Sequence, residues 1–413
     1  MSEIKQISPW QFAVFRIVFG SYLFVHFLQL IPWAGELFSN QGLLPDPRLN
    51  FTFGVLPNPL EIWQSAEFVQ FFVRIMALLA MFFALGIRRR TSAFLLWYGW
   101  ACLFNRNNLI SNPGIPYVGL LLLLCVLIPT GEPLAMTRRR DDRWCMPATI
   151  FWGAWLLLAT GYTYSGIWKL HAPSWIDGSA LYHLLHNPLA RPGVMRDLLL
   201  QLPDWTLRGL TWIALIGELL ALPLSFTRKG RAVAWIGMLA MHLGILFVVD
   251  FADLTFGMLM IHFFTFDPDW LPARKGCPAL VLFDRACGLC DRTVQFLIGE
   301  DSRGILRFAP LQGETAKPIL QKHNFSTVSW RSMILIENPG AADERLFFKS
   351  DAFLRTLAKL GGFWHVVSWL CWAPRFVRDA AYDFIAARRH RLLASELAAC
   401  RLPNRDERAR LLP

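Results

Sequence analysis

Long apolar stretches separated by short polar connections fill the first 270 residues of the chain. A helix needs about 20 predominantly apolar residues to cross the hydrocarbon core of a bilayer. Eight stretches come near this length, although the third, fourth and last are short: residues 10–33, 67–87, 91–105, 115–130, 148–168, 205–226, 231–249 and 252–266. The pattern predicts an α-helical polytopic membrane bundle of about eight spans.

The pattern changes after residue 270, where short apolar runs alternate with amphipathic ones. Strands are expected at residues 279–284, 305–309, 332–337 and 345–349, and helices at residues 287–299, 314–323 and 350–360. Proline and glycine separate several of these elements, as turn residues do. The order predicts an α/β domain over residues 276–393, preceded by a membrane domain over residues 1–270 and followed by a polar tail over residues 394–413.

Composition agrees with a membrane protein. The chain of 413 residues is 54% hydrophobic, contains 18 tryptophans and has a mean hydropathy of +0.37. These values exceed those of ordinary soluble domains, so membrane lipid is an expected partner.

The net charge of +11 is unevenly distributed over the expected connections. With a cytoplasmic N-terminus, the cytoplasmic connections contain most of the basic residues: Arg88, Arg89, Arg90, Arg138, Arg139, Arg140, Arg143, Arg228, Lys229, Arg231, Arg274 and Lys275. The outer connections contain Arg48, Arg106, Lys169, Arg191 and Arg196, although two of them are much longer. This positive-inside bias predicts a multi-pass protein with both termini in the cytoplasm. A nucleic-acid partner is not expected, because it would need basic residues gathered on a soluble face.

A pair of cysteines follows the first expected strand of the second domain. The strand ends at Asp284, and Cys287 and Cys290 come directly before an apolar helical pattern. A helix N-terminus favours a thiolate, so Cys287 would be a nucleophile and Cys290 would resolve its mixed disulfide. The alternative is half of a zinc site, although the remaining cysteines supply no second pair with this spacing.

The segment from Ala279 to about Leu393 resembles the DCC family of thioredoxin-like proteins, named for an Asp-x-x-Cys-x-x-Cys signature. Asp284, Cys287 and Cys290 fill the signature, and further matches are Phe308-Ala-Pro-Leu311, Lys349-Ser-Asp-Ala352, Ala373-Pro-Arg-Phe-Val-Arg-Asp379 and Tyr382-Asp-Phe-Ile-Ala386. The resemblance implies a thiol–disulfide oxidoreductase of the protein-disulfide reductase type, with a protein or small-molecule disulfide as its substrate. Asp284 would accept a proton from a cysteine or cap the turn.

A second group of polar residues lies where the fifth span ends. Lys169 and His171 are followed in the loop by Asp177, His183 and His186. Such a set at the mouth of a bundle suits proton handling. The alternative is that Lys169 extends its amine to the interface while the histidines are solvated.

Residues 8–270 resemble the HTTM domain, the membrane domain shared with vitamin K-dependent gamma-carboxylase. The resemblance is carried by Arg16, Gly42-Leu-Leu-Pro45, Asn105-Arg-Asn-Asn-Leu-Ile-Ser-Asn-Pro-Gly114, Gly166-Ile-Trp-Lys-Leu170 with Trp175, Gly178-Ser-Ala180, Glu218, Met241-His-Leu-Gly244 and Phe266-Asp-Pro-Asp-Trp270. It implies that Lys169 occupies the position of the base that deprotonates a quinol cofactor. The carboxylase also uses an earlier histidine, which residues 111–117 lack, and a large outer domain that is missing here. We therefore expect a cavity for a quinone or lipid rather than carboxylation.

Several ionisable residues lie inside the expected spans, where charge is costly: Arg16, His26, Arg74, Glu218, His242 and His262. Each should face the interior of the bundle or a wet cavity. A structural ion pair, such as Glu218 with Arg16 or Arg74, and a cofactor or proton path are the two interpretations.

The end of the second domain is rich in aromatic and basic residues. Residues 363–372 are too few to span a bilayer, and their aromatic side chains suit an interfacial segment or core packing. Arg375, Arg378, Arg388, Arg389 and Arg391 follow and would suit anionic headgroups.

Two functions of different class follow from these features. In one, the protein is a membrane-anchored thiol–disulfide oxidoreductase that uses Cys287 and Cys290 in the cytoplasm. In the other, the membrane part handles a quinone or lipid substrate and the DCC domain is a regulatory or binding module.

Overall fold

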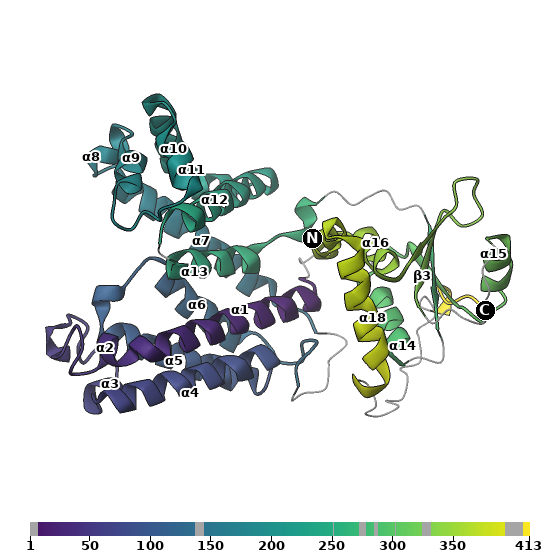
Figure 1. Ribbon diagram of the computed structural model, residues 1–413, viewed down its shortest axis with the longest axis horizontal. Coiled ribbons are helices and arrows are strands. Elements are labelled where there is room, and N and C mark those ends of the chain that lie inside the picture. The colour runs from purple at the N-terminus through teal and green to yellow at the C-terminus, as the bar shows by residue number, and fades with distance from the viewer. Residues whose placement is uncertain are drawn as a thin grey trace. The chain divides into compact units, whose positions relative to one another are not determined.

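The computed structural model divides the chain into two compact units, Met1–Phe266 and Asp267–Pro413. It describes residues 7–136, 144–250, 252–271, 278–284, 288–301, 303–323, 332–392 and 408–413. The predicted order of a helical region followed by a small α/β region is confirmed (Figure 1).

Every expected span corresponds to a helix of the first unit. The helices are α1 (Pro9–Leu30), α4 (Ala66–Leu85), α5 (Arg89–Arg106), α6 (Gly114–Leu127), α7 (Ala148–Lys169), α11 (Asp204–Ser225), α12 (Arg228–Val248) and α13 (Ala252–Thr265). Among the described residues, four helical segments are long and apolar enough to cross a bilayer, beginning at Pro9, Ala66, Asp204 and Arg228. The number of spans and their direction stay predictions.

Polar side chains and backbone breaks fix the ends of these helices. Ser8 accepts a hydrogen bond from the Trp10 amide at the start of α1, and Ser65 accepts one from the Phe68 amide at the start of α4. α4 ends at Gly86, which has a φ of 72°. Glycine adopts this left-handed conformation without steric cost, so the chain turns there toward α5.

The helices of the first unit pack in two neighbouring sets. α1 lies beside α4, and α5 beside α6; α7 lies beside α11, and α11 beside α12 (Figure 1). α13 contacts α6, α7 and α12. α1 and α4 approach closely at Gly20, where an added Cβ would lie 2.7 Å from the backbone of Ala84. Small residues permit such close packing in membrane bundles.

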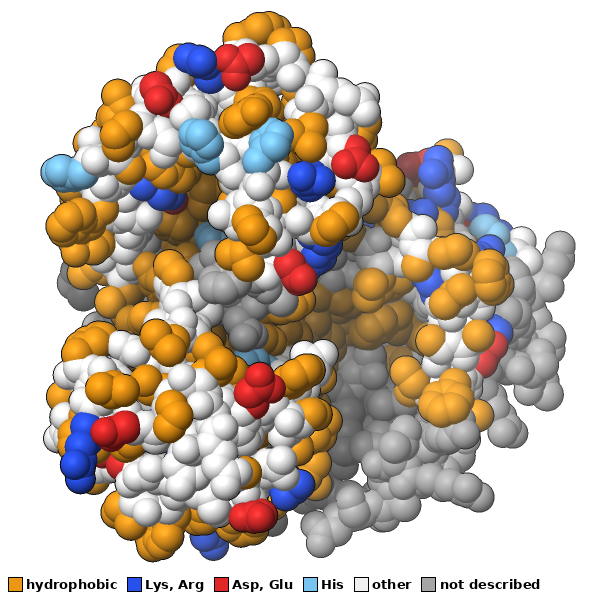
Figure 2. Space-filling model, turned by 60° about the vertical axis from the view of Figure 1, so that its left-hand side comes forward, with side chains coloured by type: hydrophobic (Ala, Val, Ile, Leu, Met, Phe, Trp, Pro, Cys, Tyr) orange, Lys and Arg blue, Asp and Glu red, His pale blue; other side chains and the backbone are white. Residues whose placement is uncertain are grey.

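Large apolar side chains remain on the outside of the first unit. Hydrophobic side chains cover much of the face shown in Figure 2. Ile213, Phe247 and Leu156 are among the exposed apolar residues of this unit. A soluble protein rarely exposes so much apolar surface, whereas lipid covers it in a membrane.

A buried ion-pair group at one end of the bundle differs from the expected pairing of Arg16 with Glu218. The Arg16 guanidinium lies 3.8 Å from Glu132 Oε1 and donates to the Leu134 carbonyl at 2.9 Å. Arg89 Nε contacts the same Glu132 oxygen at 2.7 Å. Arg74, the other expected partner, instead contacts the Gln70 side chain. Glu132 lies in a connection outside the spans, so hydrophobic periodicity could not identify it.

The second unit contains a four-stranded sheet in the order β2-β1-β3-β4. The strands are β1 (Ala279–Phe283), β2 (Leu306–Pro310), β3 (Ile334–Glu337) and β4 (Arg345–Phe348). β1 pairs in parallel with β2 and antiparallel with β3. The described helices include α14 (Gly288–Glu300), α15 (Ala316–Lys322) and α16 (Lys349–Leu360), so every expected strand and helix of this region is present.

The last residues of the chain lie against this sheet. Leu412 donates its amide to the Phe308 carbonyl at 2.7 Å, and Phe308 donates to the Arg410 carbonyl at 2.9 Å. The end of the expected polar tail is therefore tied to β2 by an isolated parallel bridge between Phe308 and Leu411.

The aromatic segment after α16 is partly packed and partly exposed. It comprises α17 (Gly362–Ser368), the 3₁₀ helix η5 (Trp369–Trp372) and α18 (Arg375–Leu392). Phe363 is buried, and Trp364 donates to Glu300 Oε2 at 2.7 Å. Trp369 and Trp372 stack on each other at a centroid distance of 5.9 Å and are exposed.

Candidate functional site

The cysteine motif lies where β1 leads into α14. α14 begins at Gly288, directly after Cys287 in the sequence, so Cys290 belongs to its first turn. Cys287 lies outside the described residues, and the side chain of Cys290 is not described either. The strand expected before the motif and the helix expected after it are present, while the roles of the two thiols stay predictions.

Asp284 lies at the carboxyl end of β1, beside the end of the parallel strand β2. Its side chain is buried, and Gln312 Nε2 donates to Asp284 Oδ1 at 3.3 Å. The Leu311 amide donates to the Phe283 carbonyl at 2.9 Å and ties the two strand ends together. A carboxylate is thus held three residues before Cys287, where it suits either proposed role, proton acceptor or turn residue.

Lys169 is the last residue of α7, and its amine has two partners that the sequence did not indicate. Lys169 Nζ lies 2.6 Å from Glu218 Oε1 of α11 and 4.2 Å from the centre of the Trp175 ring. The lysine side chain is 24% exposed and the glutamate side chain 4%. Glu218 therefore pairs with Lys169, in place of the expected Arg16 or Arg74.

The outer-loop residues named with Lys169 make other contacts. Asp177 Oδ1 accepts a hydrogen bond from the Ser179 amide at 2.8 Å, and hydrogen bonding to Ser179 lowers the pKa of Asp177. His171 lies beside the Ile167 carbonyl, and His186 stacks on Tyr182 at 4.2 Å between ring centres. His183 lies against Tyr182 as well. The loop histidines thus contact their own helical turns, and Glu218 is the acidic partner of Lys169.

Three buried rings meet deeper in the bundle. Tyr162 of α7, His242 of α12 and His262 of α13 lie with each pair of ring centres 5.9 Å apart. Within the described part of the chain, the Tyr162 hydroxyl, both His242 nitrogens and His262 Nε2 have no hydrogen-bond partner. Glu218 Oε2 is also without one. Each such group costs about 1–3 kcal/mol if it stays unsatisfied, which points to water or a ligand among them.

The sequence indicated the two histidines of this group but not Tyr162. Helical spacing could have indicated it, because Tyr162, Gly166 and Lys169 are four and then three residues apart and so share one face of a helix. Gly166 on that face is packed closely by Leu219 of α11, where an added Cβ would lie 3.0 Å from the Leu219 amide nitrogen. The close approach of α7 to α11 at this point brings Lys169 to Glu218.

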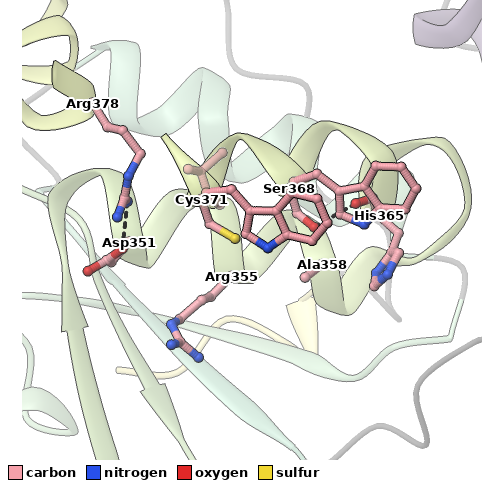
Figure 3. Close-up of a pocket in the computed structure, with 10 residues that line it drawn as sticks. Asp351, Arg355, Ala358, His365, Ser368, Cys371 and Arg378 are labelled. Atoms are coloured by element: carbon pink, nitrogen blue, oxygen red, sulfur yellow. Dashed lines mark hydrogen bonds and ion pairs between the residues drawn. The ribbon is translucent and has the colours of Figure 1, made fainter. Parts of the chain in front are cut away.

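The second unit also has an open pocket of about 520 Å³ between α16, α17 and η5 (Figure 3). Its lining includes the side chains of Arg355, His365, Cys371 and Trp372. Cys371 is a free, exposed cysteine outside the Cys287–Cys290 motif. It therefore provides a natural control for thiol chemistry in the same domain.

Comparisons with known proteins agree with both resemblances. The family model for the HTTM domain matches residues 4–270, and that for the DCC1-like thiol-disulfide oxidoreductase matches residues 281–395. The uncharacterized protein YuxK of Bacillus subtilis is 34% identical over 134 residues, which are 32% of this chain and 93% of that protein. A chloroplastic DCC family protein of Arabidopsis thaliana is 32% identical over 112 residues, which are 27% of this chain and 62% of that protein. No solved structure matches.

The HTTM match covers more than half of the chain, and together with the apolar helices it indicates a membrane protein. The DCC1-like match covers the sheet, the cysteine motif and the aromatic segment, and it supports an oxidoreductase role. The chain therefore belongs to the HTTM domain family and carries a DCC1-like thiol-disulfide oxidoreductase domain after its membrane region.

Proposed function

We propose that the protein is a membrane-anchored thiol–disulfide oxidoreductase of the protein-disulfide reductase type. The observation that carries this proposal is the DCC1-like match over residues 281–395, with α14 beginning directly after Cys287. Amide groups at a helix N-terminus stabilise a thiolate, and a thiolate is the form that attacks a disulfide.

The proposed reaction balances as a two-step thiol exchange. The Cys287 thiolate attacks one sulfur of a substrate disulfide, forms a mixed disulfide and releases the other substrate sulfur as a thiolate. The Cys290 thiolate then attacks Cys287 Sγ, which releases the second substrate thiol and leaves a Cys287–Cys290 disulfide. A thiol reductant must return the domain to its dithiol form.

The proposed compartment is the cytoplasm, because the basic connections predict that side for the C-terminal domain. Reducing conditions there keep thiols reduced, so the resting state would be the dithiol and the domain would act as a reductant. The proposed substrates are protein or small-molecule disulfides.

Cysteine variants of the full-length protein test the assignment with dithiothreitol as reductant and insulin as substrate. Cys287→Ser should abolish insulin reduction, while Cys290→Ser should accumulate a mixed disulfide that gel electrophoresis without reductant detects. Cys371→Ser is the matched control and should reduce insulin at the parent rate. Full activity in both motif variants, or one equivalent of zinc in the purified protein, would contradict the redox assignment.

A second candidate function is favoured by the buried polar groups of the membrane unit. Lys169, Glu218, Tyr162, His242 and His262 gather at α7 and its neighbours, and several of their polar atoms have no described partner. Intramembrane ionisable groups of this kind mark substrate or proton pathways. The face in Figure 2 is also hollowed between the part carrying α11 and α12 and the part carrying α1 and α4. In this function the unit handles a lipid-soluble substrate such as a quinol.

A further inference from the structure

Residues 408–413, here called the docked segment, lie along β2 and are held to it at two points. Just before the strand, Arg410 Nη1 donates to the Asp301 carbonyl at 2.9 Å. In the middle of the strand, Leu412 donates its amide to the Phe308 carbonyl at 2.7 Å. The bridge to Phe308 is parallel, so the docked segment runs toward the end of β2 at which β1 also ends.

Beyond β2, the docked segment contacts the turn formed by residues 311–315. The Thr315 amide donates to the Pro413 carbonyl at 3.0 Å. Gly313 lies so close to the same residue that an added Cβ would be 2.8 Å from the Pro413 carbonyl carbon. Leu412 packs on the buried apolar cluster of the sheet. The turn and the docked segment therefore fit closely together, and the lack of a side chain at Gly313 permits this approach.

The same turn carries a partner of the buried Asp284. Gln312 Nε2 donates to Asp284 Oδ1 at 3.3 Å. On one side of Gln312, the Leu311 amide bonds to the end of β1. On the other side, Gly313 lies against the docked segment. The turn is thus held from both sides of Gln312, and one of the two sides depends on the docked segment.

Covering the free side of β2 would by itself give the docked segment a structural role, because an unpaired strand edge invites unwanted pairing. That role ends where the strand ends, at Pro310. The contacts with Gly313 and Thr315 lie beyond that point and act on the turn. They connect the docked segment with the carboxylate that precedes the cysteine motif.

We propose that the docked segment is a positioning element for Asp284: it fixes the 311–315 turn and so keeps Gln312 on this carboxylate. The catalytic consequence rests on the thiol–disulfide exchange proposed above. There, the proton that a cysteine thiol loses on becoming a thiolate passes to Asp284. A proton acceptor must lie within hydrogen-bond reach and in the correct orientation, so release of Gln312 slows the exchange.

Carboxyl labelling of the full-length protein in detergent micelles tests the positioning without depending on thiol chemistry. A water-soluble carbodiimide and glycine ethyl ester modify accessible carboxylates, and mass spectrometry measures the rate at Asp284. Leu412→Asp places a charge against the apolar cluster, undocks the segment and should raise that rate several-fold. Leu412→Met should keep the parent rate. Ala409→Asp adds the same charge at an exposed position of the docked segment, so it is the matched control and should also keep the parent rate.

Two further measurements separate undocking from general unfolding. Glu344, whose side chain is 4% exposed, should be labelled at the parent rate in every variant. Leu412→Ala is a milder change than Leu412→Asp and should raise the labelling of Asp284 to an intermediate rate. Equal labelling of Asp284 in Leu412→Asp and Ala409→Asp would overturn the proposal. So would a rise at Asp284 that an equal rise at Glu344 accompanies throughout the series, Leu412→Ala included.

Insulin reduction with dithiothreitol measures the catalytic consequence. Leu412→Ala should lower the rate about 10-fold in the parent background. In the Asp284→Asn background it should change nothing, because both substitutions act on the same group. An equal loss in both backgrounds would show that the docked segment acts elsewhere and would overturn its role in catalysis. Failure of the parent protein to reduce insulin, with the labelling result intact, would instead refute the proposed function and leave the positioning of Asp284 in place.

Discussion

The ammonium group of Lys169 has two partners in the structure, and they give it a structural role beside its proposed chemical one. It neutralises the buried Glu218 carboxylate at 2.6 Å and lies over the Trp175 ring. Removing one partner of a buried pair leaves an uncompensated charge, which is more costly than the pair itself. The lysine therefore has a structural role whether or not it acts as a base, and a test must separate the two.

Lys169→Arg and Lys169→Met separate these roles. Arginine keeps the charge beside Glu218, so the variant should fold normally, but arginine does not serve as a base at neutral pH. If Lys169 is a base that deprotonates a quinol, Lys169→Arg should lower the rate at which added dioxygen oxidises a short-chain quinol in the presence of the protein by about 100-fold or more. Lys169→Met should in addition lower the free energy of unfolding by up to about 3 kcal/mol, because Glu218 loses its cation. Normal quinol turnover by the arginine variant would remove the base role and leave the structural one.

Residue pairing was the part of the site that the sequence predicted least. It identified Arg16, Glu218, His242 and Lys169 as buried or interfacial, because charge in an apolar stretch is visible in a linear pattern. It did not identify Glu132 as the partner of Arg16, or Lys169 as the partner of Glu218. Pairing depends on which helices pack together and at what height, and hydrophobic periodicity contains neither quantity.

At the scale of helices, a threonine of α7 bonds to the backbone of α11 one turn before a proline. Pro223 has no amide hydrogen, so the Leu219 carbonyl lacks its usual helical donor. Thr163 Oγ1 lies 3.4 Å from that carbonyl, donates to the Glu218 carbonyl at 3.2 Å and accepts from the Leu222 amide at 3.0 Å. The hydroxyl thus replaces backbone bonds one turn before the proline and fixes α11 where Glu218 meets Lys169.

Thr163→Val should therefore destabilise the protein in a way that depends on Pro223. Loss of the hydroxyl leaves buried backbone groups unsatisfied and should cost about 1 kcal/mol in the free energy of unfolding. In a Pro223→Ala background the new alanine amide can donate to the Leu219 carbonyl, so the same substitution should cost less. Equilibrium unfolding in mixed micelles measures this double-mutant cycle. Equal costs in both backgrounds would show that the threonine acts independently of the proline.

The turn between β3 and β4 should respond to acid through Glu344. The Gly340 amide donates to this carboxylate at 2.7 Å, and with His323 and Lys322 it lowers the pKa of Glu344 to about 2. A lowered pKa means that the stabilisation is complete above the ordinary value of about 4.3 and is lost as the pH falls toward 2. Glu344→Gln should reduce hydrogen-exchange protection of the hairpin at pH 7, and the difference should shrink toward pH 2. A difference that is constant with pH would exclude a role for the carboxylate charge.

Elements were predicted better than their contacts in both units. The eight apolar stretches and the strand–helix order after residue 279 are visible as period and length, and the structure reproduces each of them. The exposure of the apolar side of α18, which includes Phe376, could not be predicted, because an amphipathic pattern does not say which side of a helix faces the core. The contacts of Arg378 with Asp351 and of Tyr382 with the Met333 amide show that the polar side of α18 faces the domain.

For the molecule as a whole, the distribution of basic residues predicts the direction of insertion. One of these basic residues, Arg89, also has a structural role, since it is buried and pairs with Glu132. The bias remains without it, because Arg88, Arg90 and the arginines near residue 140 fall on the same predicted side. Orientation decides the chemistry: a dithiol persists in the reducing cytoplasm, whereas outside the cell's reducing systems the same motif would be oxidised.

Reporter fusions measure this orientation directly. Fusions after residue 90, after residue 185 and at the C-terminus should report the cytoplasm, the outer side and the cytoplasm, because basic connections are retained inside. An in-frame fusion within α4, after residue 75, is the control and should give a mixed signal. An outer location of the C-terminal fusion would contradict the eight-span arrangement. It would also reverse the proposed reaction, since Cys287 and Cys290 would then rest as a disulfide and oxidise substrate thiols instead of reducing disulfides.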